Sequence, residues 1–154
     1  MSSMKRILLA VSTGLALAAC GGPQPTPFKA VVDTKTLMAA LLEKQADIVW
    51  EAVGTTIEGY KIEEHHPTTD EEWTNVRNAA VAVTETGNLL MIVPRAQDEG
   101  WMKAAAGMIA QGERMLNAID RKNPKDVFDV GSDLYDSCVN CHMHYMPAIK
   151  DLYR

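Results

Sequence analysis

Apolar residues recur at helical spacing in four successive segments of this 154-residue chain. The segments run from Asp33 to Gly54, from Thr69 to Gly87 or a turn beyond it, from Trp101 to Ile119, and from Asn123 to Tyr145. This spacing is typical of amphipathic helices, each of which must bury its apolar stripe against another element. No segment shows the convincing alternation of a strand. The sequence therefore predicts an all-α fold, an antiparallel up-down-up-down four-helix bundle with a very short last connection.

Two of the predicted helices begin with recognisable capping signals. Thr69 stands three residues before Glu72, which is the spacing of a capping box. Asn123 directly precedes Pro124, a residue that suits the first position of a helix. The charged stretch from Glu58 to Thr68 has neither a helical nor a strand period. It is predicted to be a surface connection with solvated histidines.

The N-terminus has the features of a secretory signal over residues 1–19. Lys5 and Arg6 precede an apolar run from Ile7 to Leu17, and a pair of alanines follows it. The run is too short to cross a bilayer as a stable helix. Cleavage after residue 19 would leave 135 of the 154 residues and would change the net charge from -5 to -7, because two basic residues are removed. An acidic exported chain of this kind is not expected to bind nucleic acid.

The first residue after the expected cleavage point is Cys20. The run from Leu17 to Gly21 resembles the lipobox of bacterial lipoproteins, in which the cysteine is acylated. The alternative is an ordinary signal peptide that leaves Cys20 as an incidental free thiol, which is a liability in an oxidising compartment. Residues 20–32 include three prolines and are expected to form a semi-extended tether. The resemblance implies a periplasmic protein held by lipid, and the glycine after the cysteine points to the outer membrane of a Gram-negative bacterium.

The most specific motif is Cys-Val-Asn-Cys-His at residues 138–142. This C-x-x-C-H spacing is the signature of covalent c-type haem attachment. On a helix, Cys138 and Cys141 share one face, where each thiol can add to a haem vinyl group. His142 presents its imidazole to the iron from the same face. Export agrees with this interpretation, because bacterial haem attachment of this type takes place outside the inner membrane.

Three other interpretations of the motif stay open. The cysteines could form a redox disulfide, although the strand-helix-strand context of thioredoxin-like motifs is missing. With His142 and His144 they could bind zinc, although no separated second pair of ligands accompanies them. The spacing could also arise by coincidence in a helix.

The position of the motif on the last of four helices resembles the cytochrome c′ class of c-type cytochromes. The residues that match are Cys138, Cys141, His142 and Tyr145, and Met146 follows where the class often has a basic residue. The resemblance implies that residues 33–154 form a four-helix cytochrome domain with one covalent haem c. It further implies that His142 is the proximal iron ligand and that Tyr145 is one of the haem-binding residues.

In this class the first helix covers the other face of the haem. Met38 resembles the residue at that position and is the expected sixth ligand, with Met91 as the second choice. A methionine on a helical stripe is otherwise usually part of the core. Ligation by His142 and Met38 suits single-electron transfer, whereas a five-coordinate iron suits the binding of nitric oxide or carbon monoxide. A third interpretation is a structural lipoprotein in which haem only stabilises the helices.

No catalytic arrangement accompanies the haem motif. The sequence has no evident Ser/His/Asp set or pair of carboxylates, so we expect an electron-transfer protein and not an enzyme. Trp50, Trp73 and Trp101 are expected to pack in the core or against haem. The acidic mature chain predicts redox partner proteins with a basic surface, and the lipid anchor is the only expected contact with the membrane. The resemblance also points to a homodimer.

Overall fold

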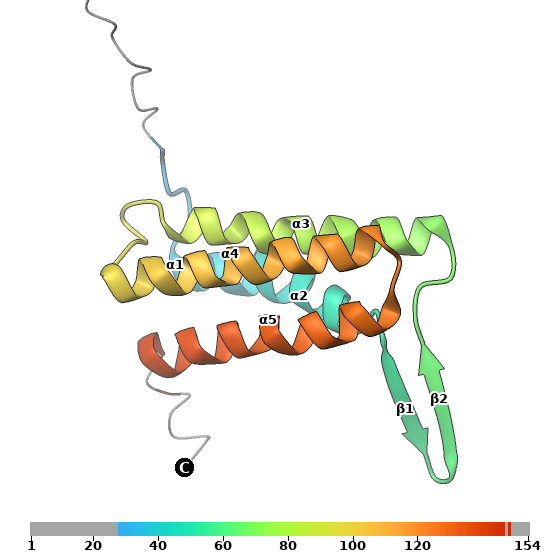
Figure 1. Cartoon of the computed structure of the whole chain (residues 1–154). Helices are drawn as coiled ribbons and strands as arrows, with labels where there is room; N and C mark the ends of the chain where they lie inside the picture. Colours follow the sequence, from blue (N-terminus) through green and yellow to red (C-terminus); the bar gives the residue numbers. More distant parts are fainter. Residues whose placement is uncertain (1–27, 147, 149–154) are drawn as a thin grey trace, which may run out of the picture.

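The computed structural model describes residues 28–146 and 148. Within them the chain is mostly helical, with one small two-stranded sheet (Figure 1). The elements in chain order are α1 (Thr34–Leu37), the π-helical turn η1 (Met38–Leu42), α2 (Glu43–Trp50), β1 (Gly54–Glu58), β2 (Lys61–His65), α3 (Asp70–Leu90), α4 (Glu99–Asp120) and α5 (Pro124–Tyr145). The expected signal peptide, Cys20 and most of the tether lie outside the described residues. None of the described helices has the length and apolar character needed to cross a membrane.

The first predicted helix is confirmed, with an irregular turn inside it. α1, η1 and α2 follow one another without a break from Thr34 to Trp50. Asp33 caps the start, because its side chain accepts a hydrogen bond from the Thr36 N–H at 2.7 Å. The helix stops before the predicted limit at Gly54, since that glycine is already the first residue of β1.

The other three predicted helices are confirmed close to their expected bounds. The Glu72 carboxylate accepts hydrogen bonds from the N–H groups of Thr68 and Thr69, and Thr69 Oγ1 accepts one from the Glu72 N–H. These backbone donors lower the pKa of Glu72 to about 2. At the start of α5, Asn123 Oδ1 accepts a hydrogen bond from the Asp126 N–H at 3.2 Å. Both capping signals in the sequence were therefore interpreted correctly.

The prediction of an all-α chain without strands is wrong for residues 54–65. β1 and β2 form an antiparallel hairpin in which Ile57 pairs with Ile62. Gly59 supplies a φ of 62° in the two-residue loop between them, a conformation that suits glycine. Both strands are exposed, so no buried apolar face marks them in the sequence. Their charged residues are equally typical of a loop, which is why the stretch was predicted to be a connection.

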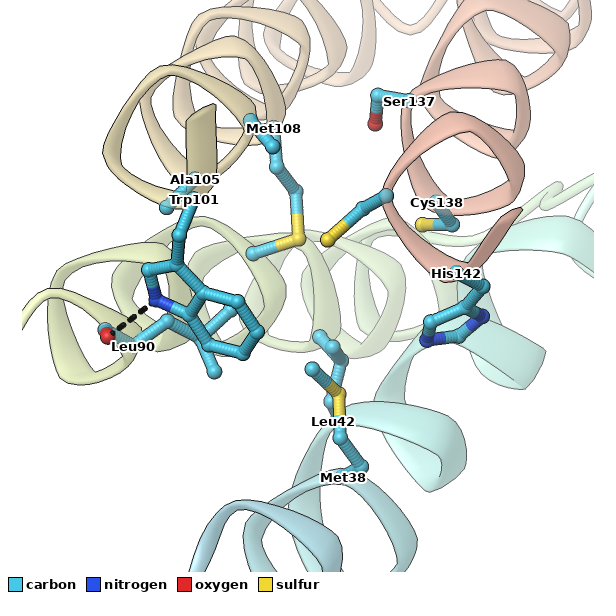
Figure 2. A pocket seen from close by; sticks show the side chains of 11 residues that line it. Met38, Leu42, Leu90, Trp101, Ala105, Met108, Ser137, Cys138 and His142 are labelled. Carbon is cyan, nitrogen blue, oxygen red and sulfur yellow. Dashed lines mark hydrogen bonds between the residues drawn. The ribbon is translucent and has the colours of Figure 1, made fainter. Parts of the chain in front are cut away.

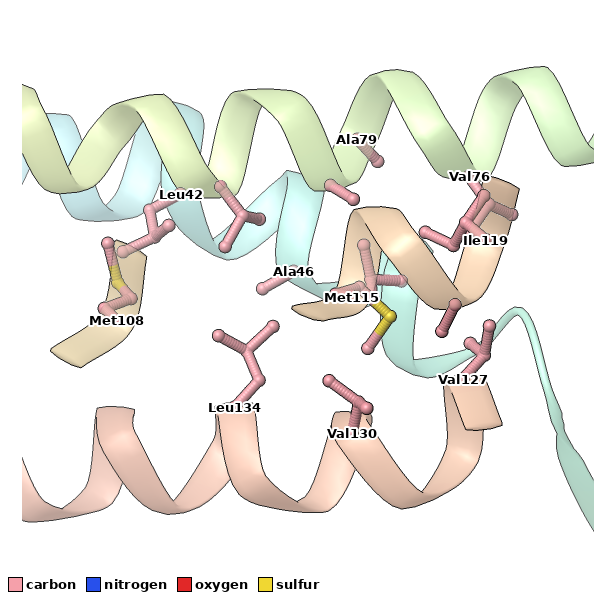
Figure 3. Close-up of a cluster of buried hydrophobic side chains, with 14 of the residues drawn as sticks. Leu42, Ala46, Val76, Ala79, Met108, Met115, Ile119, Val127, Val130 and Leu134 are labelled. Carbon is pink, nitrogen blue, oxygen red and sulfur yellow. The ribbon is translucent and has the colours of Figure 1, made fainter. Parts of the chain in front are cut away.

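The helices pack largely in chain order. α4 contacts α3 and α5 extensively and α2 packs against α3, whereas α2 and α5 make few contacts. Side chains from η1, α2, α3, α4 and α5 meet in one core (Figure 3). The largest of its fully buried apolar side chains are Val49, Val83, Met115, Ile119, Val127 and Leu134. The hairpin projects away from the helices at one end of the molecule (Figure 1).

Two glycines bring α3 and α4 into close contact. Gly112 on α4 is buried against Thr84 on α3, and Gly87 on α3 is buried against Ile109 on α4. A Cβ at either glycine would overlap the facing side chain. By contrast, a Cβ added to Gly107, on the exposed face of α4, would meet no atom within 4 Å.

Replacing Gly112 with alanine is expected to destabilise the fold by about 1–3 kcal/mol, because the new methyl group overpacks the contact between α3 and α4. Gly107→Ala is the matched control and should stabilise the same helix by up to about 1 kcal/mol, since alanine is the better helix former. Urea unfolding followed by circular dichroism measures both changes. Equal effects of the two substitutions would contradict the close contact.

Candidate functional site

A cavity lies where η1, α3, α4 and α5 meet (Figure 2). Its α5 wall is formed by Ser137, Cys138, Cys141 and His142, and η1 contributes Met38 and Leu42. Leu90 of α3 and Trp101, Ala104, Ala105 and Met108 of α4 complete the lining. The structure thus brings both cysteines and the histidine of the motif to the same cavity as Met38.

The geometry of α5 explains why the motif residues share one wall. Residues at positions i, i+3 and i+4 lie on one face of a helix, so Cys138, Cys141 and His142 project together. All three are partly buried. In Figure 2 the His142 ring and the Met38 thioether reach into the same space from two different elements.

The two cysteines are free thiols in an apolar setting. Burial raises the pKa of Cys141 above its ordinary value. Burial also raises the pKa of Cys138, where a hydrogen bond with Ser137 opposes the rise and the neighbouring Cys141 adds to it. Cysteines of redox-active disulfide motifs have a lowered pKa, so these raised values argue against the disulfide-exchange interpretation.

Met38 is the first residue of the π-helical turn. The Glu43 N–H donates a hydrogen bond to the Met38 carbonyl oxygen, five residues earlier, in place of the usual four-residue spacing. Such turns are rare and occur frequently at functional sites. Leu42, at the other end of η1, is buried and lines the same cavity. The irregular turn therefore lies at the point where the first helix meets the cavity.

A buried arginine holds the entry to the first helix. Arg95, in the connection between α3 and α4, is only 7% exposed. Its Nη2 and Nε donate hydrogen bonds to the Val32 carbonyl at 2.9 and 3.2 Å, and its Nη1 donates to the Leu89 carbonyl at 2.9 Å. The guanidinium thereby ties the segment before α1 to the end of α3. Nothing in the sequence marks Arg95 for this role, because all its partners are backbone carbonyls.

Trp101 forms part of the α4 wall. It is 4% exposed, and its Nε1 donates a hydrogen bond to the Leu90 carbonyl at 2.8 Å. The prediction that Trp101 packs in the core is therefore confirmed. Trp73 is also buried and Trp50 is partly buried, and neither of them lines the cavity.

Tyr145, predicted to be a haem-binding residue, does not line the cavity. It packs against Trp101, with the two rings edge to face and their centroids 5.1 Å apart. The Tyr145 hydroxyl donates a hydrogen bond to Asp98 Oδ1 at 2.5 Å, and the same oxygen caps α4 by accepting the Trp101 N–H at 2.8 Å. Gly100 makes room for the hydroxyl, because a Cβ there would lie 2.7 Å from it. Tyr145 therefore packs against the wall residue Trp101 and binds the cap of the helix that carries it.

Other candidate ligands lie away from the cavity. Met91, the second choice for an iron ligand, lines a separate groove with Phe28 and Val93. His65 and His66 are exposed. No three His, Cys, Asp or Glu side chains in residues 28–146 and 148 are arranged to hold a metal ion, which leaves the zinc interpretation without support.

Some lining residues were not recognised as such from the sequence. Met108 and Leu42 line the cavity, although neither belongs to the motif. One signal was available, because Met108 follows Trp101 by seven residues and therefore lies on the same face of α4. The contact between Asp98 and Tyr145 joins residues 47 positions apart, and no local pattern predicts it.

The donor set around the cavity fits a covalent haem. Two thiols and one imidazole stand on α5, and one thioether stands on η1 and another on α4, while most of the remaining lining is apolar. The empty volume of the cavity is about 390 Å³, including the part open to solvent. A flat macrocycle between His142 and Met38 would require α5 and the first helix to move apart. Few contacts between α2 and α5 oppose that movement.

No protein-family model, curated protein or solved structure matches this chain. The interpretation of the site therefore rests on the motif and on the side chains that surround it. Leu42, Leu90, Trp101 and Met108 are not part of the motif, yet they enclose it with apolar surface.

The contact between Tyr145 and Asp98 predicts a measurable titration. The hydrogen bond to Asp98, together with burial and the negative charge nearby, raises the pKa of Tyr145 from 10.0 to about 12. Because the folded pKa is raised, the contact contributes its full stability below pH 10 and loses it as the pH rises through about 12. Asp98→Asn should move this titration back toward 10, and Tyr145→Phe should remove it. The ultraviolet absorbance of the phenolate measures both, and an unchanged titration in Asp98→Asn would contradict the contact.

Proposed function

We propose that the chain is an exported, lipid-anchored c-type cytochrome that transfers single electrons through one covalently bound haem c. The observation that carries the proposal is one cavity lined by Cys138, Cys141 and His142 from α5 and by Met38 from the first helix. A C-x-x-C-H sequence can arise by coincidence. A C-x-x-C-H motif whose two cysteines and histidine line an apolar cavity together with a thioether favours haem attachment over coincidence. The proposed domain, residues 33–154, is an up-down-up-down four-helix bundle of the cytochrome c′ kind.

The α5 residues would hold the cofactor. The thiols of Cys138 and Cys141 would form the two thioether bonds, and the His142 imidazole would be the proximal ligand. When bound, the haem supplies an iron that changes between its ferric and ferrous states. α5 packs along α4, and this packing fixes the direction in which the three side chains project.

Met38 is the proposed distal ligand. A methionine thioether paired with a histidine raises the reduction potential of a haem and completes its coordination, which suits outer-sphere electron transfer. The buried side chains of Leu42, Leu90 and Trp101 give the cavity an apolar lining, which lowers the local dielectric constant. None of these roles needs a general base or a nucleophile, so we propose electron transfer and no enzymatic activity.

The proposal includes a location and a class of partner. Cys20 would carry the lipid that holds the mature chain in the periplasm, at the outer membrane of a Gram-negative bacterium. The mature chain would have a net charge of -7, since the chain as a whole has -5 and the signal carries two basic residues. A redox partner with a basic surface would complement that charge and associate faster at low ionic strength.

A second candidate function is the binding of small gases by a five-coordinate haem. It is favoured by the observation that Met38 is only partly buried and that Leu42 lines the same cavity. If Met38 only packs, apolar side chains would cover the open face of the iron, as gas binding requires. A scaffold lipoprotein in which haem only stabilises the helices would instead exchange electrons slowly with every periplasmic donor.

Replacing both Cys138 and Cys141 with alanine is expected to abolish covalent haem, because no thiol remains on α5 to form a thioether bond. The matched control is Ser137→Ala, which changes the same wall of the cavity without removing a thiol. Haem that stays with the polypeptide after denaturation measures the bond, by staining or by mass. Full retention in the double variant would refute the assignment.

Met38→Ala is expected to convert a low-spin ferric spectrum to a high-spin one and to open the ferrous form to carbon monoxide, because the sixth ligand is lost. Met108→Ala is the control, since it removes a buried thioether from the α4 wall of the same cavity. It should cost about 2–5 kcal/mol of stability and leave the spectrum low-spin. The visible absorption spectrum distinguishes the Met38→Ala variant from the Met108→Ala variant. A Met38→Ala protein that stays low-spin would exclude Met38, and a high-spin spectrum of the unaltered protein would favour gas binding.

A further inference from the structure

We propose that the end of the molecule next to the cavity rests on the bilayer surface through an exposed apolar patch. The patch, here called the N-terminal patch, consists of residues 28–32 and 91–93. Phe28, Val31 and Val93 are 73%, 82% and 76% exposed, which is unusual for side chains of this size. The proposal rests on the proposed acylation of Cys20 and adds a second contact, made by the folded chain itself, to the lipid anchor.

Two segments that are far apart in the sequence form the N-terminal patch. Phe28 lines one groove together with Met91, Ile92 and Val93, and Asn88 is its one polar lining residue. The hydrogen bonds from Arg95 to the Val32 carbonyl join the same two segments a few residues further on. In Figure 1 the segment before α1 and the connection after α3 lie at one end of the helices, and the hairpin projects from the other end. The patch is therefore a surface at one end of the fold.

The charge of the N-terminal patch differs from that of the rest of the chain. Its two segments contain one basic residue, Lys29, and no acidic residue, in a chain with 20 Asp and Glu residues. Apolar side chains beside a lysine suit the boundary between lipid headgroups and acyl chains, where the apolar groups leave water and the ammonium group meets phosphate.

The tether is short enough to bring the N-terminal patch to the membrane. Phe28 is eight residues after Cys20. A fully extended chain spans at most about 3.3–3.6 Å per residue, so acylation of Cys20 would keep Phe28 within about 30 Å of the headgroups. Such confinement gives the patch a high effective concentration at the bilayer, and even a weak contact is then well populated.

The small size of the N-terminal patch favours a bilayer over a protein partner. Stable protein interfaces usually bury at least about 1,200 Å² in total. Three well-exposed side chains and their partly buried neighbours cannot supply such an area alone. A bilayer needs no matching shape and gains free energy from each apolar side chain that enters it.

Contact through the N-terminal patch would hold the cavity close to the membrane. Leu90 lines the cavity, and the next residue, Met91, lines the groove of the patch. The hairpin lies at the opposite end of the helices and would be held away from the bilayer (Figure 1).

The test uses the full, haem-loaded and exported chain in vesicles of phosphatidylcholine that carry a photoreactive carbene precursor. Mass spectrometry of the peptides locates the lipid adducts, and the N-terminal peptide reports whether Cys20 is acylated. Adducts should be at least about fivefold more frequent in the N-terminal patch than in the hairpin, because only the patch leaves water. Similar or greater labelling of the hairpin, with Cys20 acylated, would overturn this proposal and leave the proposed anchor intact. A mature chain with unmodified Cys20 would overturn both this proposal and the proposed lipid anchor.

Two double variants provide a second test of the lipid contact. Val31→Ser with Val93→Ser should lower the labelling of the patch at least about fivefold, because two apolar groups that enter the lipid are removed. The control is Ile57→Ser with Ile62→Ser, which removes two exposed aliphatic side chains from the hairpin and should leave the labelling of the patch unchanged. Circular dichroism and the haem spectrum confirm that both variants are folded. Unchanged labelling in the first pair, or cross-links from the patch to a second copy of the chain in place of lipid, would overturn the proposal.

Discussion

The cavity depends on how α5 packs against α4. The buried stripe of α5, formed by Val127, Val130 and Leu134, continues at helical spacing into Cys138 and Cys141. Burial of the stripe therefore decides which way the motif faces, before any cofactor is considered. α4 is in turn held against α3 by the close approach at Gly112. The chemistry of the site thus relies on apolar packing more than one helical turn away from it.

The first helix is held differently. Its contacts with α5 are sparse, so its position relies on α3 and on polar interactions at its start. Asp33 caps α1, and Arg95 binds the carbonyl oxygen of the residue before Asp33. The π-helical turn that begins at Met38 follows directly. If Met38 is the proposed ligand, this support matters, because the backbone position decides how closely its thioether could approach the haem.

Local signals in the sequence were sufficient for most of the fold. The caps at Thr69 and Asn123 use hydrogen bonds within three residues, so sequence spacing alone predicts them. The hairpin was missed because its strands bury nothing, and Ile57 faces solvent as much as a loop residue does. The role of Tyr145 could not be predicted, since its partner Asp98 is the cap of another helix, 47 residues earlier in the sequence. The motif predicted that Cys138, Cys141 and His142 share one face of α5, and the structure places Met38, named from the family resemblance, at the same cavity.

Burial of the motif also bears on how haem would be joined to the chain. Thiolate is the reactive form of cysteine, and burial raises the pKa of both Cys138 and Cys141. With α5 packed in the closed fold, the thiols are therefore poorer nucleophiles than they would be on an exposed α5. The closed cavity is also too narrow for a flat macrocycle to enter without movement. Both constraints favour attachment before the first helix closes over α5, and the sparse contact between α2 and α5 is the place where that closure would occur.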